Sequence, residues 1–295
     1  MVNRFLFFCF VTLTTYHLHA QDVNEGLVAH YSFDACDNPG VDESGNNSAA
    51  VIQGNPECVC GVSGNALLLD GVDDYLLFLG TISNSFNTVD FTVSLYIKPN
   101  GGGGIQDVIS KKEACDRNRA FSISYVPNSN TLRTQLSQDE DRFTNMDAAL
   151  DFSNCWYHLV YIRRGNRSQF FIDGELVREQ VADSRVQIDN NAELNIANGE
   201  CVGITENRFS GIVDELRVYN RALRVEEIQT LYLRPDKIEN DDEVVFLGNA
   251  VDITVGETCA DAFAWNPTAG VLNPAAAETS TVSPACGLPS CSRPK

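Results

Sequence analysis

The chain has 295 residues, 43% of them hydrophobic and 21% charged, so it can build a large domain core. Its formal net charge of −19 comes from 40 acidic and 21 basic residues. A surface this acidic repels phosphate backbones and anionic lipid headgroups, which argues against nucleic-acid binding and peripheral membrane binding. Acidity does suit hard cations such as calcium, although it also serves simply to keep an exported protein soluble.

The first 20 residues have the features of a cleaved export signal. Arg4 is a short positive region, residues 5–15 form an apolar run, and Ala20 ends an acceptable cleavage site. This run is too short for a permanent anchor, and no other stretch reaches about 18 apolar residues. We therefore expect a secreted or cell-surface protein with no membrane insertion, and we exclude residues 1–20 from the fold.

Export also determines how the cysteines are interpreted, because disulfides are the default in an oxidising compartment. The Cys58-Val59-Cys60 spacing lacks the two intervening residues of zinc and thioredoxin-type motifs, which favours structural bridges. The disulfide candidates are Cys36, Cys58, Cys60, Cys115, Cys155 and Cys201. Their pairing stays open, with Cys115–Cys155 as the expected pair because these residues would sit at the edges of nearby strands.

Residues 27–219 are dominated by alternation of apolar and polar side chains, which is typical of half-buried strands. The segment 90–99 places its odd-numbered residues on an apolar face, and residues 121–125 alternate in the same way. Asp173-Gly174 separates two further runs and predicts a type I′ hairpin, which needs positive φ at both central residues. Many short strands with turn residues between them predict a sandwich or jelly roll.

One helix is credible, over 222–233, with Glu226 and Glu227 in its early part, where acids complement the helix dipole. The sandwich is expected to span 24–235, followed by a polar linker over 236–242. The remaining residues, 243–295, are expected to form a smaller unit. Its apolar runs predict short strands at 244–247, 251–256 and 263–267.

Several segments resemble the laminin-G-like, concanavalin A-type jelly-roll family, in family order from about 26 to 233. They are the first strand Gly26–Asp34, the Gly64–Tyr75 segment (similar to G-x-A-L-x-F-D-G-x-D-D-Y) and the closing Gly211–Leu223 segment (similar to G-x-I-D-E-V-R-I-Y-N-R-A-L). The resemblance implies an all-β sandwich of two antiparallel sheets with one short C-terminal helix. Arg224 stands where the family usually has a capping serine, so we expect fraying at this helix end.

The Trp265–Pro274 segment resembles the "W-x-P-x-x-G-L-x-N-P" segment of immunoglobulin-like repeats in bacterial surface proteins. This resemblance implies that 243–295 is a partial immunoglobulin-like repeat with an irregular tail.

Motifs that would indicate catalysis are missing from the sequence. There is no E-x-D-x-x-E of the kind that pairs carboxylates in related glycosidases, no G-x-S-x-G, and no zinc spacing. Asp139-Glu140-Asp141 is interpreted as a solvated turn, and His158 as a packing or hydrogen-bonding group. Catalysis through His30 or His158 is not favoured. We therefore assign no catalytic residue and expect that the chain is not an enzyme.

Asp214 is the most informative single residue, because it shares strand parity with Leu216 and Val218 and should point to the apolar side. A carboxylate there needs hydrogen bonds or a cation. In the family that the chain resembles, the first and last strands meet and relatives can hold calcium there. The hypothesis is a calcium site built from Asp34, Asp42 and Asp214. The alternative is that Asp214 accepts backbone N–H bonds.

A second acidic stretch, Asp70, Asp73 and Asp74, is interpreted as a turn whose side chains bond their own backbone, in preference to a cation site. The tyrosines Tyr96 and Tyr157 (with Tyr161) would stack on sugar rings if they were exposed, although core positions are favoured for them.

The favoured function is a non-catalytic extracellular recognition or adhesion module that binds a glycan or glycoprotein, with calcium as the only cofactor considered. Two alternatives stay open. The chain would otherwise be an accessory carbohydrate-binding domain of a larger glycan-degrading, glycosyl hydrolase system, or a structural stalk or spacer of a cell-surface protein.

Overall fold

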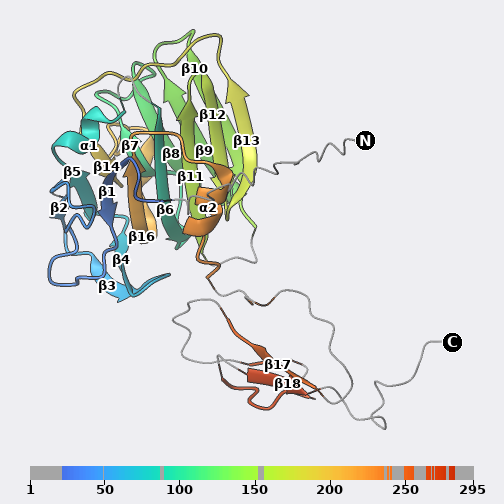
Figure 1. Cartoon of the computed structure of the whole chain (residues 1–295). Helices are drawn as coiled ribbons and strands as arrows, with labels where there is room; N and C mark the ends of the chain where they lie inside the picture. Colours follow the sequence, from blue (N-terminus) through green and yellow to red (C-terminus); the bar gives the residue numbers. More distant parts are fainter. Residues whose placement is uncertain are drawn as a thin grey trace, which may run out of the picture.

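The computed structural model describes residues 22–48, 50–86, 90–151, 156–235, 238, 240, 249–255, 264–266, 268, 270–276 and 279–282. Its main body consists of two β-sheets that pack face to face (Figure 1). This arrangement confirms the predicted all-β sandwich of two antiparallel sheets.

Sheet A has eight strands. In spatial order they are β13 (Glu175–Val181), β12 (Arg167–Ile172), β11 (Tyr157–Arg164), β6 (Phe91–Pro99), β16 (Ser210–Tyr219), β4 (Asn65–Asp70) and β3 (Glu57–Cys60), with β1 (Leu27–Tyr31) also paired to β16.

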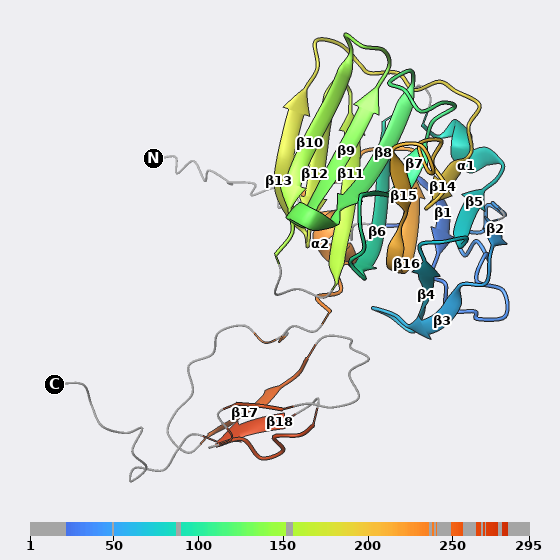
Figure 2. The same cartoon turned by 180° about the vertical axis from the view of Figure 1, so that it is seen from behind.

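Sheet B also has eight strands and lies in front when the molecule is seen from behind (Figure 2). In spatial order they are β10 (Phe143–Ala149), β9 (Thr131–Ser137), β8 (Ala120–Val126), β7 (Ile105–Lys111), β14 (Leu194–Ile196), β5 (Tyr75–Phe78) and β2 (Ala50–Gln53), with β15 (Glu206–Arg208) paired in parallel to β7. Two short helical turns, α1 (Thr81–Asn84) and η1 (Pro127–Ser129), connect strands.

The core lies between the sheets and follows from the predicted alternation. Phe91, Val93, Leu95 and Ile97 of β6 are all fully buried in it. The Asp173-Gly174 hairpin is confirmed as well, with φ of 52° and 80° at the two turn residues. Burial of apolar side chains at about 25 cal/mol per Å² is the main force that holds such a sandwich together.

β16 is the central element for the sites described below. Its first half pairs with β4, from Ser210↔Asp70 to Val213↔Leu67, and its second half pairs with β1. Between the halves its register with β6 shifts, and Glu215 has a φ of 50°. Such a bulge inserts a residue and changes which side chains face the core.

The helix α2 (Val225–Leu231) lies on the outer face of sheet A (Figure 1) and covers a second apolar cluster that includes Val160, Ile162 and Phe171. It is shorter than the predicted 222–233. The Glu227 carboxylate accepts a 2.7 Å hydrogen bond from the backbone N–H of Arg224, and so caps the helix end where a serine is absent.

Two predicted features of 243–295 fall partly on described residues. β17 (Ala250–Ile253) matches the run at 251–256 and pairs with β18 (Thr279–Val282), while the run at 244–247 lies outside the described residues. The described part of 263–267 is not in a strand. The Trp265 indole N–H donates to the Ala276 carbonyl at 2.7 Å. The immunoglobulin-like assignment and the domain boundaries stay predictions.

Disulfides tie the sandwich together at two places. Cys36 is bonded to Cys58, and Cys115 to Cys201 across 86 residues of sequence. Cys60 is disulfide-bonded as well. The expected Cys115–Cys155 pair is therefore wrong, and Cys155 lies outside the described residues.

Within the described part of the chain, no helix has the length and apolar character needed to cross a membrane.

Candidate ligand pocket

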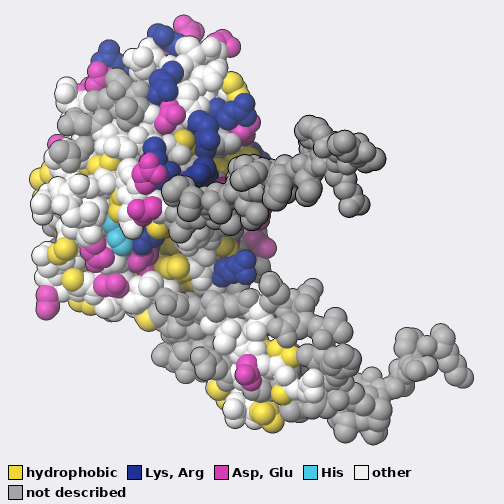
Figure 3. All heavy atoms as spheres, viewed as in Figure 1, with side chains coloured by type: hydrophobic (Ala, Val, Ile, Leu, Met, Phe, Trp, Pro, Cys, Tyr) yellow, Lys and Arg dark blue, Asp and Glu magenta, His cyan; other side chains and the backbone are white. Residues whose placement is uncertain are grey.

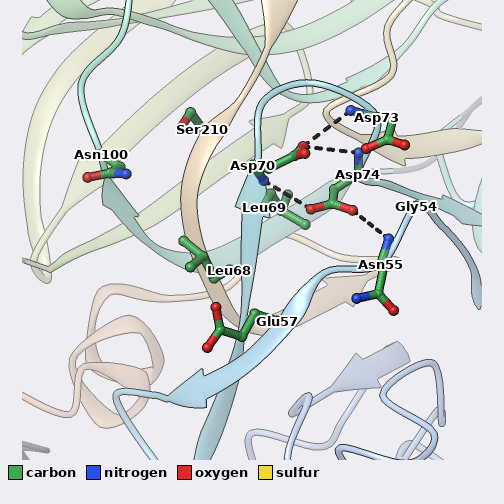
Figure 4. Close-up of a pocket in the computed structure, with 10 residues that line it drawn as sticks. All are labelled: Gly54, Asn55, Glu57, Leu68, Leu69, Asp70, Asp73, Asp74, Asn100 and Ser210. Carbon is green, nitrogen blue, oxygen red and sulfur yellow. Dashed lines mark hydrogen bonds between the residues drawn. The ribbon is translucent and has the colours of Figure 1, made fainter.

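A polar pocket of about 670 Å³ opens at one edge of sheet A, and we call it the acidic pocket (Figure 4). The residues that line it are Gly54, Asn55, Glu57, Leu68, Leu69, Asp70, Asp73, Asp74, Asn100 and Ser210. They come from the β2–β3 connection, β3, β4, the β4–β5 turn, the position after β6 and the start of β16. The antiparallel pairing of these strands brings segments that are far apart in sequence to one edge.

The β4–β5 turn forms one wall of the acidic pocket and is held by its own carboxylates. Asp70 Oδ1 accepts the N–H groups of Val72, Asp73 and Asp74 at 2.7, 3.2 and 3.3 Å. Asp74 accepts from the Asp70 N–H at 3.0 Å and from the Asn55 N–H at 2.7 Å. The bonds that Asp70 accepts, that from the Val72 N–H foremost, lower the pKa of Asp70. The interpretation of this stretch as a turn is confirmed.

Most of the remaining polar side chains of the pocket are exposed to solvent. Glu57, Asp73 and Asn100 are all exposed, and the side chains of Glu57 and Asn100 have no hydrogen-bond partner among the described residues. A carboxylate accepts hydrogen bonds and an amide both donates and accepts them. Among the described lining residues there is no aromatic side chain. The pocket therefore offers hydrogen bonds, and little stacking surface, to a ligand rich in hydroxyl groups.

Asp214 is fully buried, but on the face opposite to the predicted one. Val213, Leu216 and Val218 face the core, whereas Asp214 pairs in register with Tyr96, which belongs to a cluster on the outer face of sheet A. The bulge at Glu215 shifts the parity by one residue, so the expectation that Asp214 shares a face with Leu216 and Val218 is wrong.

The Asp214 carboxylate accepts three backbone hydrogen bonds, as in the alternative to calcium. Its donors are the N–H groups of Val62 at 2.6 Å, Ser63 at 3.4 Å and Glu215 at 2.9 Å. Burial nevertheless raises the pKa of Asp214 to about 8. Asp34 accepts the N–H of Asn65 at 2.7 Å, so both carboxylates hold the β3–β4 turn.

Asp42 serves a different loop. It accepts the N–H groups of His30, Ser44 and Ser48 at 2.9–3.0 Å. Among the described residues, the group of three or more acidic, His or Cys ligands whose atoms lie within 4.8 Å of one another is Asp70, Asp73 and Asp74. Asp34, Asp42 and Asp214 are thus not gathered into one cluster, and calcium binding by them stays a prediction.

The aromatic and histidine side chains considered from the sequence lie in packed positions. Tyr96, Tyr157 and Tyr161 are at most 4% exposed, so the core interpretation is confirmed and none presents a stacking face. His158 is fully buried, its ring stacks on Tyr96, and its Nε2 lies 2.8 Å from the Ser94 hydroxyl. Burial lowers the pKa of His158 to about 3.

His30 Nε2 lies 2.9 Å from the Glu215 carboxylate, within hydrogen-bonding distance. Asp139 accepts the N–H groups of Asp141 and Arg142, which confirms a turn there.

Sequence reasoning missed most of the acidic pocket. Only its turn had a recognisable signal, the Asp-Gly-x-Asp-Asp pattern. Asn55, Glu57, Asn100 and Ser210 are single polar residues in separate segments, and no local pattern links them. Their proximity depends on strand order, which the sequence does not display.

Comparison with known proteins identifies a family for more than half of the chain. Residues 70–229 match the laminin-G-like family model described as the concanavalin A-like lectin/glucanases superfamily. No curated protein matches the chain.

Solved structures with the same fold include two toxin domains. The binding domain of Paraclostridial Mosquitocidal Protein 1 is 18% identical, with a TM-score of 0.57 over 72% of this chain and 53% of that one. A botulinum neurotoxin type C structure, whose cell entry is described as dependent on two ganglioside molecules, is 16% identical, with a TM-score of 0.58 over 71% of this chain and 51% of that one. The chain thus spans about half the length of these toxin domains.

A third similar structure is domain 4 of AbnA, a GH43 extracellular arabinanase from Geobacillus stearothermophilus, in complex with arabinotriose. It is 22% identical, with a TM-score of 0.54 over 70% of this chain and 98% of that domain. At these identities the likeness concerns the fold.

Proposed function

Because the chain belongs to the concanavalin A-like lectin/glucanases superfamily, we propose that it is a non-catalytic glycan-binding module that acts outside the cell. The observation that carries this proposal is the acidic pocket, which presents exposed carboxylate and amide groups at the open edge of a rigid sandwich. The arabinotriose-bound domain 4 of AbnA, matched over nearly its whole length, supports a neutral oligosaccharide as the ligand class.

The pocket divides into a rigid part and a ligand-facing part. The carboxylate oxygens of Asp70 and Asp74 accept backbone hydrogen bonds and so fix the shape of the turn. Glu57, Asp73 and Asn100 remain exposed around the opening. The turn is therefore preformed, and binding would have to order only the exposed side chains, at a cost of about 0.5–1.5 kcal/mol each. Sugar hydroxyls both donate and accept, and would pair with the exposed carboxylates as donors and with Asn100 in either direction.

The surroundings of the histidines and of Asp74, which are residue types that catalyse reactions in many enzymes, support a binding role for this chain. His158 has no solvent access, and His30 is paired with Glu215. In the acidic pocket, Asp74 is a buried residue, 4% exposed, whose carboxylate already accepts two backbone N–H bonds. We propose on this basis that the chain is not an enzyme. The disulfides Cys36–Cys58 and Cys115–Cys201 support export, since such bonds persist in oxidising compartments.

The test is a glycan array probed with the full chain, in calcium and again in EDTA. Binding to a defined set of neutral oligosaccharides, weakened by Glu57→Gln and by Asn100→Ala, is the expected result. The matched control is Glu140→Gln, because Glu140 is 76% exposed in a turn of sheet B and lies outside the pocket. No selective glycan binding in either buffer would refute the proposal.

Calcium dependence is proposed as a separate property, supported by the acidic surface, which suits a hard cation. Glycan binding that EDTA abolishes would support it, and equal binding in both buffers would contradict it while leaving the glycan proposal intact.

One alternative has an observation in its favour. The matched AbnA domain is part of an arabinanase, which is consistent with this chain being the accessory carbohydrate-binding domain of a larger glycan-degrading system. Specific binding to the polysaccharide of such a system, and not to glycoproteins, would favour that alternative.

A further inference from the structure

A second pocket, which we call the basic groove, lies on the outer face of sheet A beside α2. Its volume is about 490 Å³. It is lined by Arg164, Arg167, Gln169, Phe171, Arg224 and Val225, among others. Figure 3 shows several Lys and Arg side chains gathered over this side of the molecule. Two strands, β6 and β16, separate β11 from β4. The groove and the acidic pocket therefore lie toward opposite lateral edges of sheet A.

The groove forms where the cover provided by α2 ends. Phe171 is buried beneath the helix, but its neighbour in register, Leu176, is 48% exposed. Val225, at the first turn of the helix, is 46% exposed. Leu176 lies outside the lining of the groove, so Val225 supplies the exposed apolar surface that is available there to the non-polar face of a ligand.

The charges of the groove are opposite to those of the whole chain. Three arginines line it on a protein with a formal net charge of −19. Arg164 donates to the Leu223 carbonyl at 2.8 Å, a neutral partner, and has no ion-pair partner among the described residues. Arg167 is paired with Glu179.

Arg224 is only weakly neutralised. It lies 3.5 Å from Glu227, whose carboxylate is already held by both terminal nitrogens of Arg221 at 3.0 and 2.8 Å. The acid that lines the groove, Glu226, is exposed. Arg164 and Arg224 thus retain guanidinium charge and donor capacity at one opening.

We propose that the basic groove binds an acidic saccharide, with Arg164 and Arg224 pairing with its anionic group and Val225 contacting its ring. A guanidinium fork matches a carboxylate or sulfate through two parallel hydrogen bonds, which an ammonium cannot reproduce. Gln169 supplies an amide for a neighbouring hydroxyl. This site differs from the acidic pocket in place and in charge, so it does not depend on the function proposed above.

The test is calorimetric titration of the full chain with three probes: trigalacturonate, a sulfated disaccharide, and neutral galactotriose. Binding of one or both acidic probes that the groove substitutions weaken is expected, whereas any binding of galactotriose should be unchanged by those substitutions. Affinity should fall as salt is raised, because the pairing is between charges. Arg224→Gln and Arg164→Lys should each weaken binding about ten-fold or more, since a lost charged hydrogen bond has an effect of this order.

The matched control is Arg133→Gln, because Arg133 is a similarly exposed arginine on β9 of sheet B. The affinity of this variant for the acidic probes should equal that of the unchanged chain. Arg224 is 57% exposed, so its replacement should not affect folding, and thermal melts of each variant check this.

Equal binding of inorganic sulfate would show an anion site without saccharide recognition and overturn the proposal. Absent binding of both acidic probes, or unchanged affinity in Arg224→Gln, would overturn it as well. Glu57→Gln should leave this binding unchanged whatever happens at the acidic pocket.

Discussion

Asp214 Oδ2 accepts a 2.6 Å hydrogen bond from the backbone N–H of Val62, 152 residues earlier in the chain. The contact joins the middle of β16 to the β3–β4 turn at the point where the partner of β16 changes from β4 to β1. A buried N–H without an acceptor is costly, and the turn has no strand partner there. The carboxylate therefore substitutes for a missing strand at the junction.

Replacing Asp214 should destabilise the fold through this turn. Asp214→Ala leaves buried N–H groups unpaired, and we expect a loss of about 2–4 kcal/mol in the free energy of unfolding. Asp214→Asn keeps one acceptor oxygen and should lose less. Urea unfolding of both variants measures this order, with Asp183→Asn, an exposed carboxylate, as the control. Equal stability of Asp214→Ala and the unchanged chain, with or without calcium, would contradict the structural role.

Asp107 should make stability depend on pH. It is fully buried, it accepts the Gly199 N–H at 2.8 Å, and its Oδ1 has no partner among the described residues. Burial raises the pKa of Asp107 to about 6. The folded state thus binds the proton more tightly than the unfolded state. The resulting contribution is complete below about pH 4 and is lost as pH rises through 6.

The measurement is a set of urea titrations between pH 4 and 7 on the unchanged chain and on Asp107→Asn. The free energy of unfolding of the unchanged chain should fall, relative to that of Asp107→Asn, as the pH rises over this interval. Parallel stability curves would show that Asp107 does not titrate in this range.

The Cys115–Cys201 bond should be a major contributor to stability. It links residues 86 apart in sequence, and closing a long loop removes entropy from the unfolded chain. The Cys115→Ser, Cys201→Ser double variant should lose about 2–5 kcal/mol. Thermal melts give the loss, and peptide mapping under non-reducing conditions should recover Cys115 with Cys201. Recovery of Cys115 with Cys155 would contradict the pairing.

Glu227 should stabilise the attachment of α2. It accepts the Arg224 N–H and pairs with Arg221, and the Arg221 bonds lower the pKa of Glu227 to about 2. A carboxyl with a lowered pKa contributes stability at neutral pH that is lost as pH falls from about 4.5 to 2. Glu227→Gln should cost about 1–3 kcal/mol at pH 7 and much less at pH 2. Glu226→Gln, at an exposed position next to it, is the control and should show no such difference.

Much of the fold could be predicted from local patterns. Alternation over 90–99 placed Phe91 and Leu95 in the core, and Asp173-Gly174 marked a hairpin, because side-chain period and turn chemistry are properties of short segments. Parity failed at Asp214, since the bulge at Glu215 inserts a residue that the alternating pattern does not reveal.

By itself, the sequence determined the class of fold, the two-sided character of its strands, the turn at Asp70–Asp74 and the presence of disulfides. Only the tertiary structure decided which cysteines pair, where Asp34, Asp42 and Asp214 lie, and that Glu57 and Asn100 share a pocket. The physical reason is that local patterns report each residue's immediate neighbours in the chain. Strand order and register, by contrast, arise from burying the whole apolar surface at once, and they alone bring distant residues together.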